Sequence, residues 1–421
     1  MNKTKINVVF TTKNLQNTLN LLDSIQKINS LESTRNYILN ITILDKTVKQ
    51  NLTKIIKKFN FDIDLISISI IKHLEKKYLS LLNEANCITS MDSIQRARTQ
   101  QQIYILENQD RFKNSIIWQV DDDVLFGKSN YINNQHNVTY SKDYFSDIVK
   151  FYIENKSVDA IISPTSYVPP IPALLYCYTQ LEDLFNREYI VKKNFDRMEY
   201  HDYYTQSNTE KYYSLFLSKS DNINRAVKDI LIGKPVTKVA SCGKQSLKPR
   251  LKESKLLRGG NFIVFNMDIF RIPHLGFSEH NNIPARRSDM IHTQLLTELN
   301  FTIKDVSYFS LVHNRTFNEA SIESATQKYF SDMIGALLIQ YLYKGNEEFD
   351  NRLQFHQIHI KKILKLLHEN IEVSEFKNEM DKLQELDFQI NSFDKEYFIN
   401  EFEDFKINKN QLILKLCKLA S

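Results

Sequence analysis

The chain of 421 residues is poor in the residues that mark several specialised classes of protein, with 8 Gly, 8 Pro, 4 Cys and 1 Trp. Its cysteines are far apart and form no CxxC pair, which argues against a zinc site or a disulfide framework and fits a reducing compartment. No signal peptide opens the sequence. The most apolar long window, residues 160–178, is interrupted by prolines and predicts no transmembrane helix. We therefore expect a cytoplasmic protein and leave peripheral contact with a membrane open.

An excess of one charge is also lacking, because 55 Lys and Arg face 50 Asp and Glu and leave a net charge of +5. A surplus this small argues against a nucleic-acid partner. Hydrophobic residues make up 42% and aromatic residues 11% of the chain, which is too much for a disordered protein. At about 150 residues per domain, the length allows two or three globular domains.

In the first part of the chain, short apolar runs alternate with segments of helical periodicity. They predict, in order, strand 6–10, helix 15–25, strand 37–44, helix 48–59, strand 62–71, helix 93–108, strand 115–120 and strand 158–162. This alternation predicts an α/β fold with a mostly parallel sheet flanked by helices. Ligands of such sheets bind beyond the carboxyl ends of the strands, so Thr11, Asp45 and the residues after Val120 should lie along one edge.

The prolines are confined to residues 164–284, and the tail that follows is helical in pattern at 329–343, at 355–369 and in amphipathic runs to residue 416. We predict an α/β domain over residues 1–318 and a C-terminal α-helical region over 319–421. The nucleotide-binding half of the first domain would span about residues 1–127, and its acceptor-side half about 128–318.

Two segments of the middle region allow two interpretations each. Residues 238–258 are strongly basic, and Gly243 and Pro249 favour a loop, which is either a solvated surface loop or a mobile loop that closes over a pyrophosphate. Residues 195–213 are rich in Phe, Tyr and His. They form either an acceptor cleft, whose aromatic rings stack on sugars, or a packed insert.

The strongest signal is a row of three carboxylates, Asp121, Asp122 and Asp123, directly after the apolar strand 115–120. Their mutual repulsion would raise their pKa values and destabilise the turn. A divalent cation bound by the first and third carboxylates removes this cost, and Mg²⁺ or Mn²⁺ in such a site commonly bridges to substrate phosphates. The alternatives are an exposed acidic turn or an Asp that caps the next helix.

The segment Val120-Asp121-Asp122-Asp123-Val124-Leu125-Phe126 resembles the DxD region of glycosyltransferases with the GT-A fold, which use a nucleotide-sugar donor and a metal ion. Other segments resemble hallmarks of this superfamily in the same order, over roughly residues 6–315. They are Val8-Val9-Phe10-Thr11-Thr12, Asp45, Arg96-Ala97-Arg98-Thr99, Arg258-Gly259-Gly260-Asn261-Phe262, Arg287-Ser288-Asp289-Met290 and Val312-His313-Asn314. Thr99 stands where the superfamily has Asn, and Ser288 where it has Glu.

The resemblance implies roles for the matching residues. The metal, Mn²⁺ or Mg²⁺, would be bound by Asp121, Asp123 and His313. The nucleotide-sugar would contact Thr11, Asp45, Arg98, Asp121, Asp122, Gly259 and Gly260. Asp289, just before a helix predicted at 290–299, would be the general base that removes the acceptor proton.

Each of these residues also has a plain structural alternative. Asp289 is well placed to cap a helix, and Arg98 to pair with a surface acid. Gly259 and Gly260 would suit an ordinary turn. His313 follows an apolar strand predicted at 306–312, where a lone His is often structural.

We therefore predict a metal-dependent glycosyltransferase that moves a hexosyl or N-acetylhexosaminyl group from a UDP- or GDP-sugar to a hydroxyl of a glycan, a lipid carrier or a protein. It would invert the anomeric configuration if Asp289 is the base, and a retaining route is the alternative. A sugar-nucleotide nucleotidyltransferase should have a Gly-rich basic loop after its first strand, and Thr11-Thr12-Lys13-Asn14 contains no Gly. A non-catalytic binding module of the same fold is the third hypothesis. The donor sugar and the oligomeric state stay open.

Overall fold

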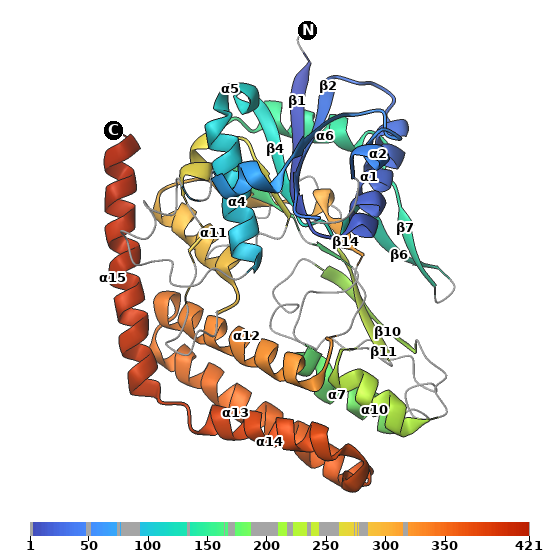
Figure 1. Ribbon diagram of the computed structural model, residues 1–421, viewed down its shortest axis with the longest axis vertical. Helices are drawn as coiled ribbons and strands as arrows, with labels where there is room; N and C mark the ends of the chain where they lie inside the picture. Colours follow the sequence, from blue (N-terminus) through green and yellow to red (C-terminus); the bar gives the residue numbers. More distant parts are fainter. Residues whose placement is uncertain are drawn as a thin grey trace.

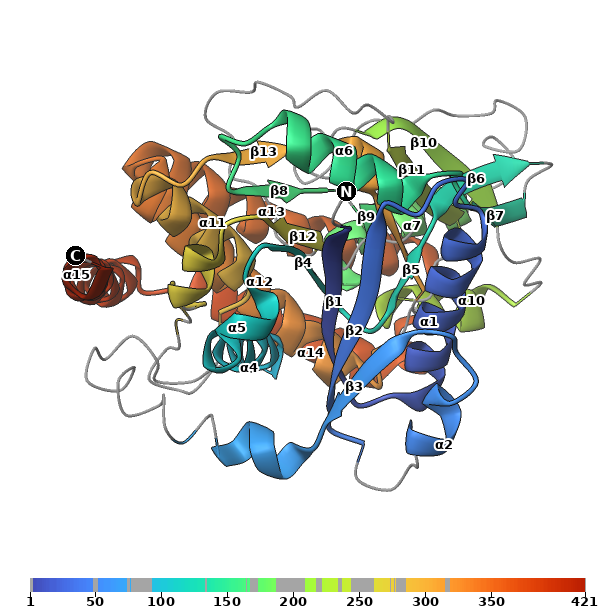
Figure 2. The same cartoon turned by 90° about the horizontal axis from the view of Figure 1, so that it is seen from above.

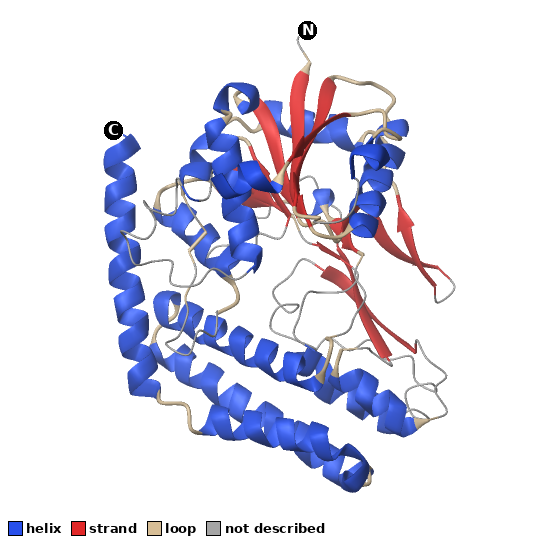
Figure 3. Ribbon diagram, in the orientation of Figure 1, coloured by secondary structure: helices blue, strands red, loops and turns tan. Residues whose placement is uncertain are grey.

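The computed structural model of the chain describes most of its residues. These are 3–47, 52–73, 76, 93–132, 135–163, 165–166, 173–186, 209–216, 222–233, 237–243, 261–272, 274–275, 277, 285–314 and 319–420. Helices surround a central sheet, and long helices lie below and beside it (Figures 1 and 3).

The central sheet has seven strands in the order β13(Ile303–Asp305), β8(Ala160–Ile162), β12(Asn261–Val264), β4(Ser115–Val120), β1(Thr4–Thr12), β2(Tyr37–Asp45) and β3(Asp62–Ile66), as Figure 2 shows from above. All neighbouring pairs are parallel except those of β12, which runs antiparallel to both β4 and β8. The predicted α/β fold with a mostly parallel sheet is confirmed.

Three smaller sheets accompany the central one. A three-stranded sheet contains β5(Val124–Phe126), β14(Leu311–His313) and β9(Thr165–Ser166), in that spatial order. Two hairpin-like pairs are formed by β6(Lys128–Ile132) with β7(Gln135–Thr139), and by β10(Thr209–Phe216) with β11(Thr237–Gly243). In the three-stranded sheet, β5 follows β4 directly along the chain. This sheet therefore borders the edge at which the three carboxylates lie.

Both faces of the central sheet are buried, and alternate residues of β1 supply the two sides. Ile6, Val8 and Phe10 pack with α1(Leu15–Ser30) and α6(Tyr144–Glu154), whereas Val9 packs on the side of α4(Ser93–Glu107), α5(Gln109–Phe112) and α11(Ser288–Glu298). Burial on both faces explains the continuous apolar runs of the sequence. The strand ends are consequently the places where polar side chains can gather.

The tail is helical, as predicted. It consists of α12(Ile322–Tyr343), α13(Asn346–Asn370), the short helix η3(Val373–Phe376), α14(Lys377–Asn391) and α15(Lys395–Ala420). Its apolar residues belong to the same hydrophobic core as those of α4, α11, α7(Ala173–Phe185) and α10(Ile223–Leu231). The boundary at residue 318 therefore stays a prediction. No helix in the described part of the chain is both long enough and apolar enough to span a bilayer.

Some predicted elements were wrong. The strand predicted over 62–71 ends at Ile66, and residues 68–73 are helical, with the amide of Ile71 donating to the carbonyl of Ser67 at 3.2 Å. The alternation of Ser and Ile there resembles a strand, but Ile68 and Ile70 are exposed, and the pairing of β3 with β2 ends at Ile66. The helix predicted over 48–59 is reduced to α2(Leu52–Ile56), with residues 48–51 outside the described part of the chain.

Two further predictions failed around aromatic and basic segments. The strand predicted over 306–312 is a short helix, η2(Ser307–Phe309), followed by β14, because Phe309 turns inward against Trp118. Residues 237–243 form β11 instead of a loop, since they pair with β10. The rest of the basic stretch, residues 244–258, lies outside the described residues, as does most of the aromatic run 195–213.

Trp118 organises the core beside the acidic edge. Its fully buried ring contacts four other rings, those of Phe126, Tyr144, Phe145 and Phe309, with centroid distances of 4.8 to 6.2 Å. Its indole Nε1 donates to Oδ1 of buried Asn261 at 2.7 Å, and Asn261 Nδ2 donates to the carbonyl of Phe309 at 2.8 Å. The network ties β4, β12 and η2 together with its polar groups satisfied.

We expect Trp118→Phe to lower the free energy of unfolding by about 2–4 kcal/mol, because the smaller ring leaves a cavity and Asn261 loses its donor. Urea unfolding followed by circular dichroism measures this change. Phe388→Ala, which removes a side chain that is 73% exposed, should change the stability by less than about 0.5 kcal/mol. Equal stabilities of the two variants would contradict the assignment of Trp118 as the centre of this core.

Candidate active site

The carboxyl ends of β1, β2 and β4 lie next to one another, as the parallel fold predicts. Thr12 is in register with Asp45 on β2, and the amide of Lys46 donates to the carbonyl of Thr12 at 2.9 Å. The three carboxylates follow β4 on the other side of β1. The structure thus brings Thr11, Asp45 and the acidic run to one edge of the sheet.

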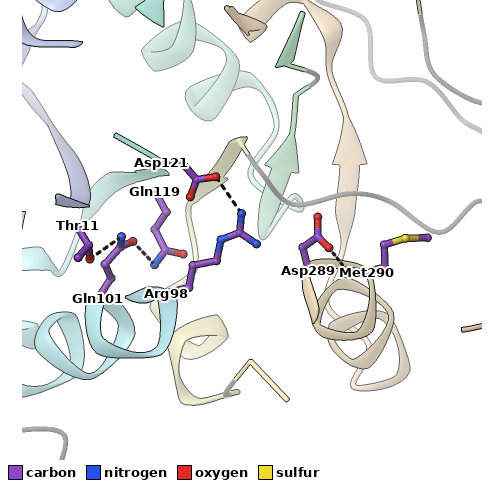
Figure 4. A network of polar contacts seen from close by, with 7 residues as sticks. All are labelled: Thr11, Arg98, Gln101, Gln119, Asp121, Asp289 and Met290. Atoms are coloured by element: carbon purple, nitrogen blue, oxygen red, sulfur yellow. Dashed lines mark hydrogen bonds and ion pairs between the residues drawn. The ribbon is translucent and has the colours of Figure 1, made fainter. Parts of the chain in front are cut away.

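Arg98 joins this edge from α4. Its Nη2 lies 3.2 Å from Oδ2 of Asp121, and the two side chains are 12% and 35% exposed (Figure 4). The pair is neither fully buried nor freely solvated, so a bound anion can contact the guanidinium from the open side. The alternative that Arg98 pairs with an acid holds in part, but that acid is the first carboxylate of the predicted site.

A chain of amides connects β4 to β1 behind the ion pair. Gln119 Nε2 donates to Gln101 Oε1 at 3.2 Å, and Gln101 Nε2 donates to Thr11 Oγ1 at 3.2 Å (Figure 4). The Thr11 hydroxyl donates in turn to the carbonyl of Ala97 at 3.4 Å. These bonds fix α4, and with it Arg98, against the strand ends.

Asp122 is bonded to β1. Its Oδ2 accepts a hydrogen bond from the Thr12 hydroxyl at 2.7 Å. Burial raises the pKa of this carboxyl to about 6. The hydrogen bond from Thr12 opposes the shift, and the neighbouring Asp123 and Asp121 add to it. Burial is therefore the main cause of the shift, and the repulsion within the acidic run that the sequence predicts adds a smaller part.

Asp289 reaches the same pocket from α11. The sequence predicted that Asp289 lies just before the helix. It lies inside the first turn instead, and Arg287 occupies the N-cap position. Oδ1 of Asp289 accepts the amide of Met290 at 3.0 Å, and no hydrogen bond to its Oδ2 is made within the described ranges of the chain (Figure 4). Asp289 is thus not the N-cap residue, although its carboxylate accepts an amide of the first turn, and its role as general base stays a prediction.

One pocket unites these groups. It is lined by Arg98, Gln101, Gln119, Val120, Asp121, Phe262, His274, Asp289, His292 and Thr293. Asp121 and Asp289, far apart in the sequence, are thereby placed on the walls of a single pocket, with a cation between the strand end and the helix. A carboxylate beside a phosphate-binding cation suits proton removal next to a leaving group.

Two stacked histidines form another wall of the pocket. The rings of His274 and His292 have centroids 3.9 Å apart, and both residues are buried. His292 Nε2 lies 2.9 Å from the carbonyl of Ile272, to which Gln102 Nε2 also donates at 3.2 Å. Burial lowers the pKa of His292 to about 4 and that of His274 well below its usual value, with Arg98 lowering both further. Both rings are neutral at pH 7 and add no charge to the pocket.

The backbone segments that carry the predicted metal ligands lie next to each other. His313 is the last residue of β14, is buried, and pairs with Val124, the residue after Asp123. The amide of Asn314 donates to the carbonyl of Asp123 at 2.7 Å. Two carboxylates and an imidazole are suitable donors for Mn²⁺ or Mg²⁺. Among the described residues, however, no three His, Cys, Asp or Glu side chains already converge on one point.

Other predicted site residues are placed differently. The Asp45 carboxylate accepts from the amide and the hydroxyl of Thr47, at 2.8 and 2.5 Å, and is absent from the lining of the pocket. Gly259 and Gly260 lie outside the described residues.

Several pocket residues were missed in the sequence. Gln119 carried a signal, because a polar residue in the middle of a buried strand needs a partner. Gln101 sits one turn after Arg98 on the same helix. The histidine pair gave no signal, since His274 and His292 meet only through the tertiary fold.

Comparisons with known proteins add the following. No family model and no curated protein matches the chain. Among solved structures, S. aureus TarS 1-349 is 10% identical and aligns over 92% of this chain and 91% of its own, with a TM-score of 0.35. Mouse xyloside xylosyltransferase 1 is 11% identical over 78% and 80% of the two chains, with a TM-score of 0.30. Core-mannan synthase A from Aspergillus fumigatus, in its Mn/GDP form, is 10% identical over 77% and 68%, with a TM-score of 0.25.

Identities near one tenth and TM-scores this low assign the chain to no family. The function therefore has to follow from the residues of the pocket.

We expect the raised pKa of Asp122 to be visible in the stability of the protein. The folded carboxyl titrates near pH 6 and the unfolded one near 3.8, so the folded state binds more protons between these values and loses stability as the pH rises through them. Asp122→Asn removes this loss. The free energy of unfolding of the variant minus that of the wild type should therefore increase from pH 4 to pH 6.5, by at most about 1.4 kcal/mol per pH unit. The difference between their melting temperatures, measured over the same pH range, reports this increase.

Asp110→Asn is the control for this measurement. Lys113 lowers the pKa of the exposed Asp110 carboxyl, which therefore titrates below this range. The difference in stability between Asp110→Asn and the wild type should stay constant between pH 4 and pH 6.5. A flat difference for Asp122→Asn as well would show that this carboxyl is not perturbed.

Proposed function

We propose that the protein is a glycosyltransferase that moves a hexosyl or N-acetylhexosaminyl group from a UDP- or GDP-sugar to an acceptor hydroxyl. The observation that carries the proposal is the shared pocket, in which Asp289 on α11 faces the Arg98–Asp121 pair at the carboxyl edge of the sheet. A candidate base and a guanidinium on the walls of one pocket suit a transfer in which an acceptor oxygen loses its proton next to an anionic leaving group.

Each group would have a separate task. Arg98 would donate hydrogen bonds to the phosphates of the donor, and the amide chain from Gln119 to Thr11 would keep it in place. The strand ends that carry Thr11, Asp45 and Asp122 would bind the nucleoside. Gly259 and Gly260 would contact the nucleotide-sugar. Asp289 would accept the proton of the acceptor hydroxyl as that oxygen attacks the anomeric carbon, which inverts its configuration.

The residues fit a divalent cation by chemistry and by position in the chain. Asp121, Asp123 and His313 would hold Mn²⁺ or Mg²⁺, which would neutralise charge on the diphosphate leaving group when bound. The neighbouring carboxylates support this, because Asp123 and Asp121 both add to the raised pKa of Asp122 and a cation would offset their repulsion.

The alternatives are less well supported. A nucleotidyltransferase needs a phosphate-binding loop after its first strand, whereas here Asn14 caps α1 directly, its side chain accepting the amide of Asn17 at 3.1 Å. A non-catalytic module has no need of a carboxylate held toward the pocket at a helix start. A panel of UDP- and GDP-sugars tested for Mn²⁺-dependent hydrolysis and transfer distinguishes the three. Donor binding without turnover would favour the module.

Asp289→Asn should separate chemistry from binding. The amide keeps the shape of the side chain but cannot take a proton at neutral pH, so kcat should fall by about 10² to 10⁴-fold while the donor affinity is unchanged. Calorimetry and a turnover assay measure the two quantities. Glu323→Gln, which alters an acid in the first turn of α12, should leave kcat as it is. Turnover near the wild-type level in Asp289→Asn would favour a retaining mechanism or another base.

Asp123→Ala tests the metal assignment. Loss of one anionic ligand should weaken Mn²⁺-dependent donor binding by about 10 to 100-fold. Binding measured in EDTA should be equally weak for the variant and the wild type. A variant that keeps the full Mn²⁺ effect on donor affinity would exclude Asp123 as a ligand.

A further inference from the structure

The segment that carries Asp289 is held in place by α12, the first helix of the C-terminal region. Arg287, two residues before Asp289, has φ +78° and ψ 23°, a left-handed conformation that a residue with a long side chain rarely adopts. Such a conformation persists only where the surroundings impose it. Here the residues that impose it belong to α12 of the C-terminal helical region.

A buried ion pair provides the first constraint. Nη2 of Arg287 lies 2.8 Å from Oδ2 of Asp332 on α12, and the two side chains are only 5% and 2% exposed. Opening this pair would separate two opposite charges in the protein interior, which is strongly unfavourable. The side chain of Arg287 is therefore held in one direction, and the backbone that bears Asp289 follows it.

Direct backbone contact provides the second constraint. The amide of Arg286 donates to the carbonyl of Ser331 at 3.1 Å. One turn further along α12, a Cβ on Gly335 would lie 2.0 Å from the carbonyl oxygen of Arg286. Only glycine allows the helix to approach the segment this closely.

The other end of α11 is also tied to the tail. Nζ of Lys409 on α15 lies 2.8 Å from Oε2 of Glu298 at the end of α11, and the Lys409 side chain is buried. Figure 1 shows α15 running alongside α11, with α12 below it. The helix that presents Asp289 is thus held at both ends by the C-terminal helical region.

We propose that Arg287, Asp332 and Gly335 are positioning residues for Asp289, and that the tail thereby sets the catalytic rate without touching the substrate. This rests on the proposed function for its kinetic consequence. The donor site is built on β1, β4 and α4, which these residues do not contact through the bonds described above. Disturbing them should therefore slow turnover and spare donor binding.

The informative variant is the double substitution Arg287→Gly with Asp332→Asn. Glycine accepts the left-handed backbone, and both charges of the pair are removed together, so the protein should fold without the ion pair that restrains the segment. We expect kcat to fall by at least about 10-fold and the donor Kd to stay within about twofold of the wild type. Asp332→Asn alone should show at least the same loss of kcat.

Glu319→Gln is the matched control, because it breaks an ion pair with Lys328 on the same helix without touching residues 285–289. Its kcat should stay within about twofold. A folded double variant with wild-type kcat would overturn the proposal, and so would a loss confined to donor affinity.

Hydrogen exchange makes the test independent of the enzymatic assignment. The amides of Arg286 and Ile291, bonded to Ser331 and Arg287 respectively, should exchange at least about 10-fold faster in the double variant than in Glu319→Gln. Faster exchange would support the grip even if no donor were turned over, in which case only the proposed function would fail. Equal exchange would overturn the proposal.

Discussion

The complete burial of β4 is the constraint on which the rest of the site depends. All six of its residues are buried, with β1 on one side, β12 on the other and a hydrophobic layer on each face. A strand in this position cannot carry charge along its length, so its carboxylates are placed where it ends. Arg98, the amide chain and the Thr12 hydroxyl then gather around these carboxylates, because each satisfies a group that the strand end exposes.

Residues of the α/β body line the pocket, and the helical tail supports one of its walls. One wall belongs to strands near the beginning of the chain, and the opposite wall belongs to α11, whose position depends on α12 and α15. The two regions share one hydrophobic core. The boundary predicted at residue 318 is therefore visible in the sequence pattern, but it does not separate two hydrophobic cores.

Features that depend on local sequence were predictable, and features that depend on distant contacts were not. The strand 115–120 and its acidic end follow from an apolar run and a row of like charges. The same reasoning failed for Ile68 and Ile70, since alternation indicates a strand only where a neighbour covers it. The histidine stack and the left-handed Arg287 could not be predicted, because each is imposed by residues that are remote in the sequence.

The grip of α12 on Arg287 has a consequence for biosynthesis. The ribosome releases the chain from its N-terminus, and the strands and α4 can begin to pack before the tail exists. Asp332 and Gly335 emerge only after every residue that lines the pocket. A nascent chain can therefore assemble the acidic end of β4 before α12 exists, whereas residues 285–289 reach their final position only after α12 has been synthesised and docked. Premature termination before that helix would leave this segment without Ser331, Asp332 and Gly335.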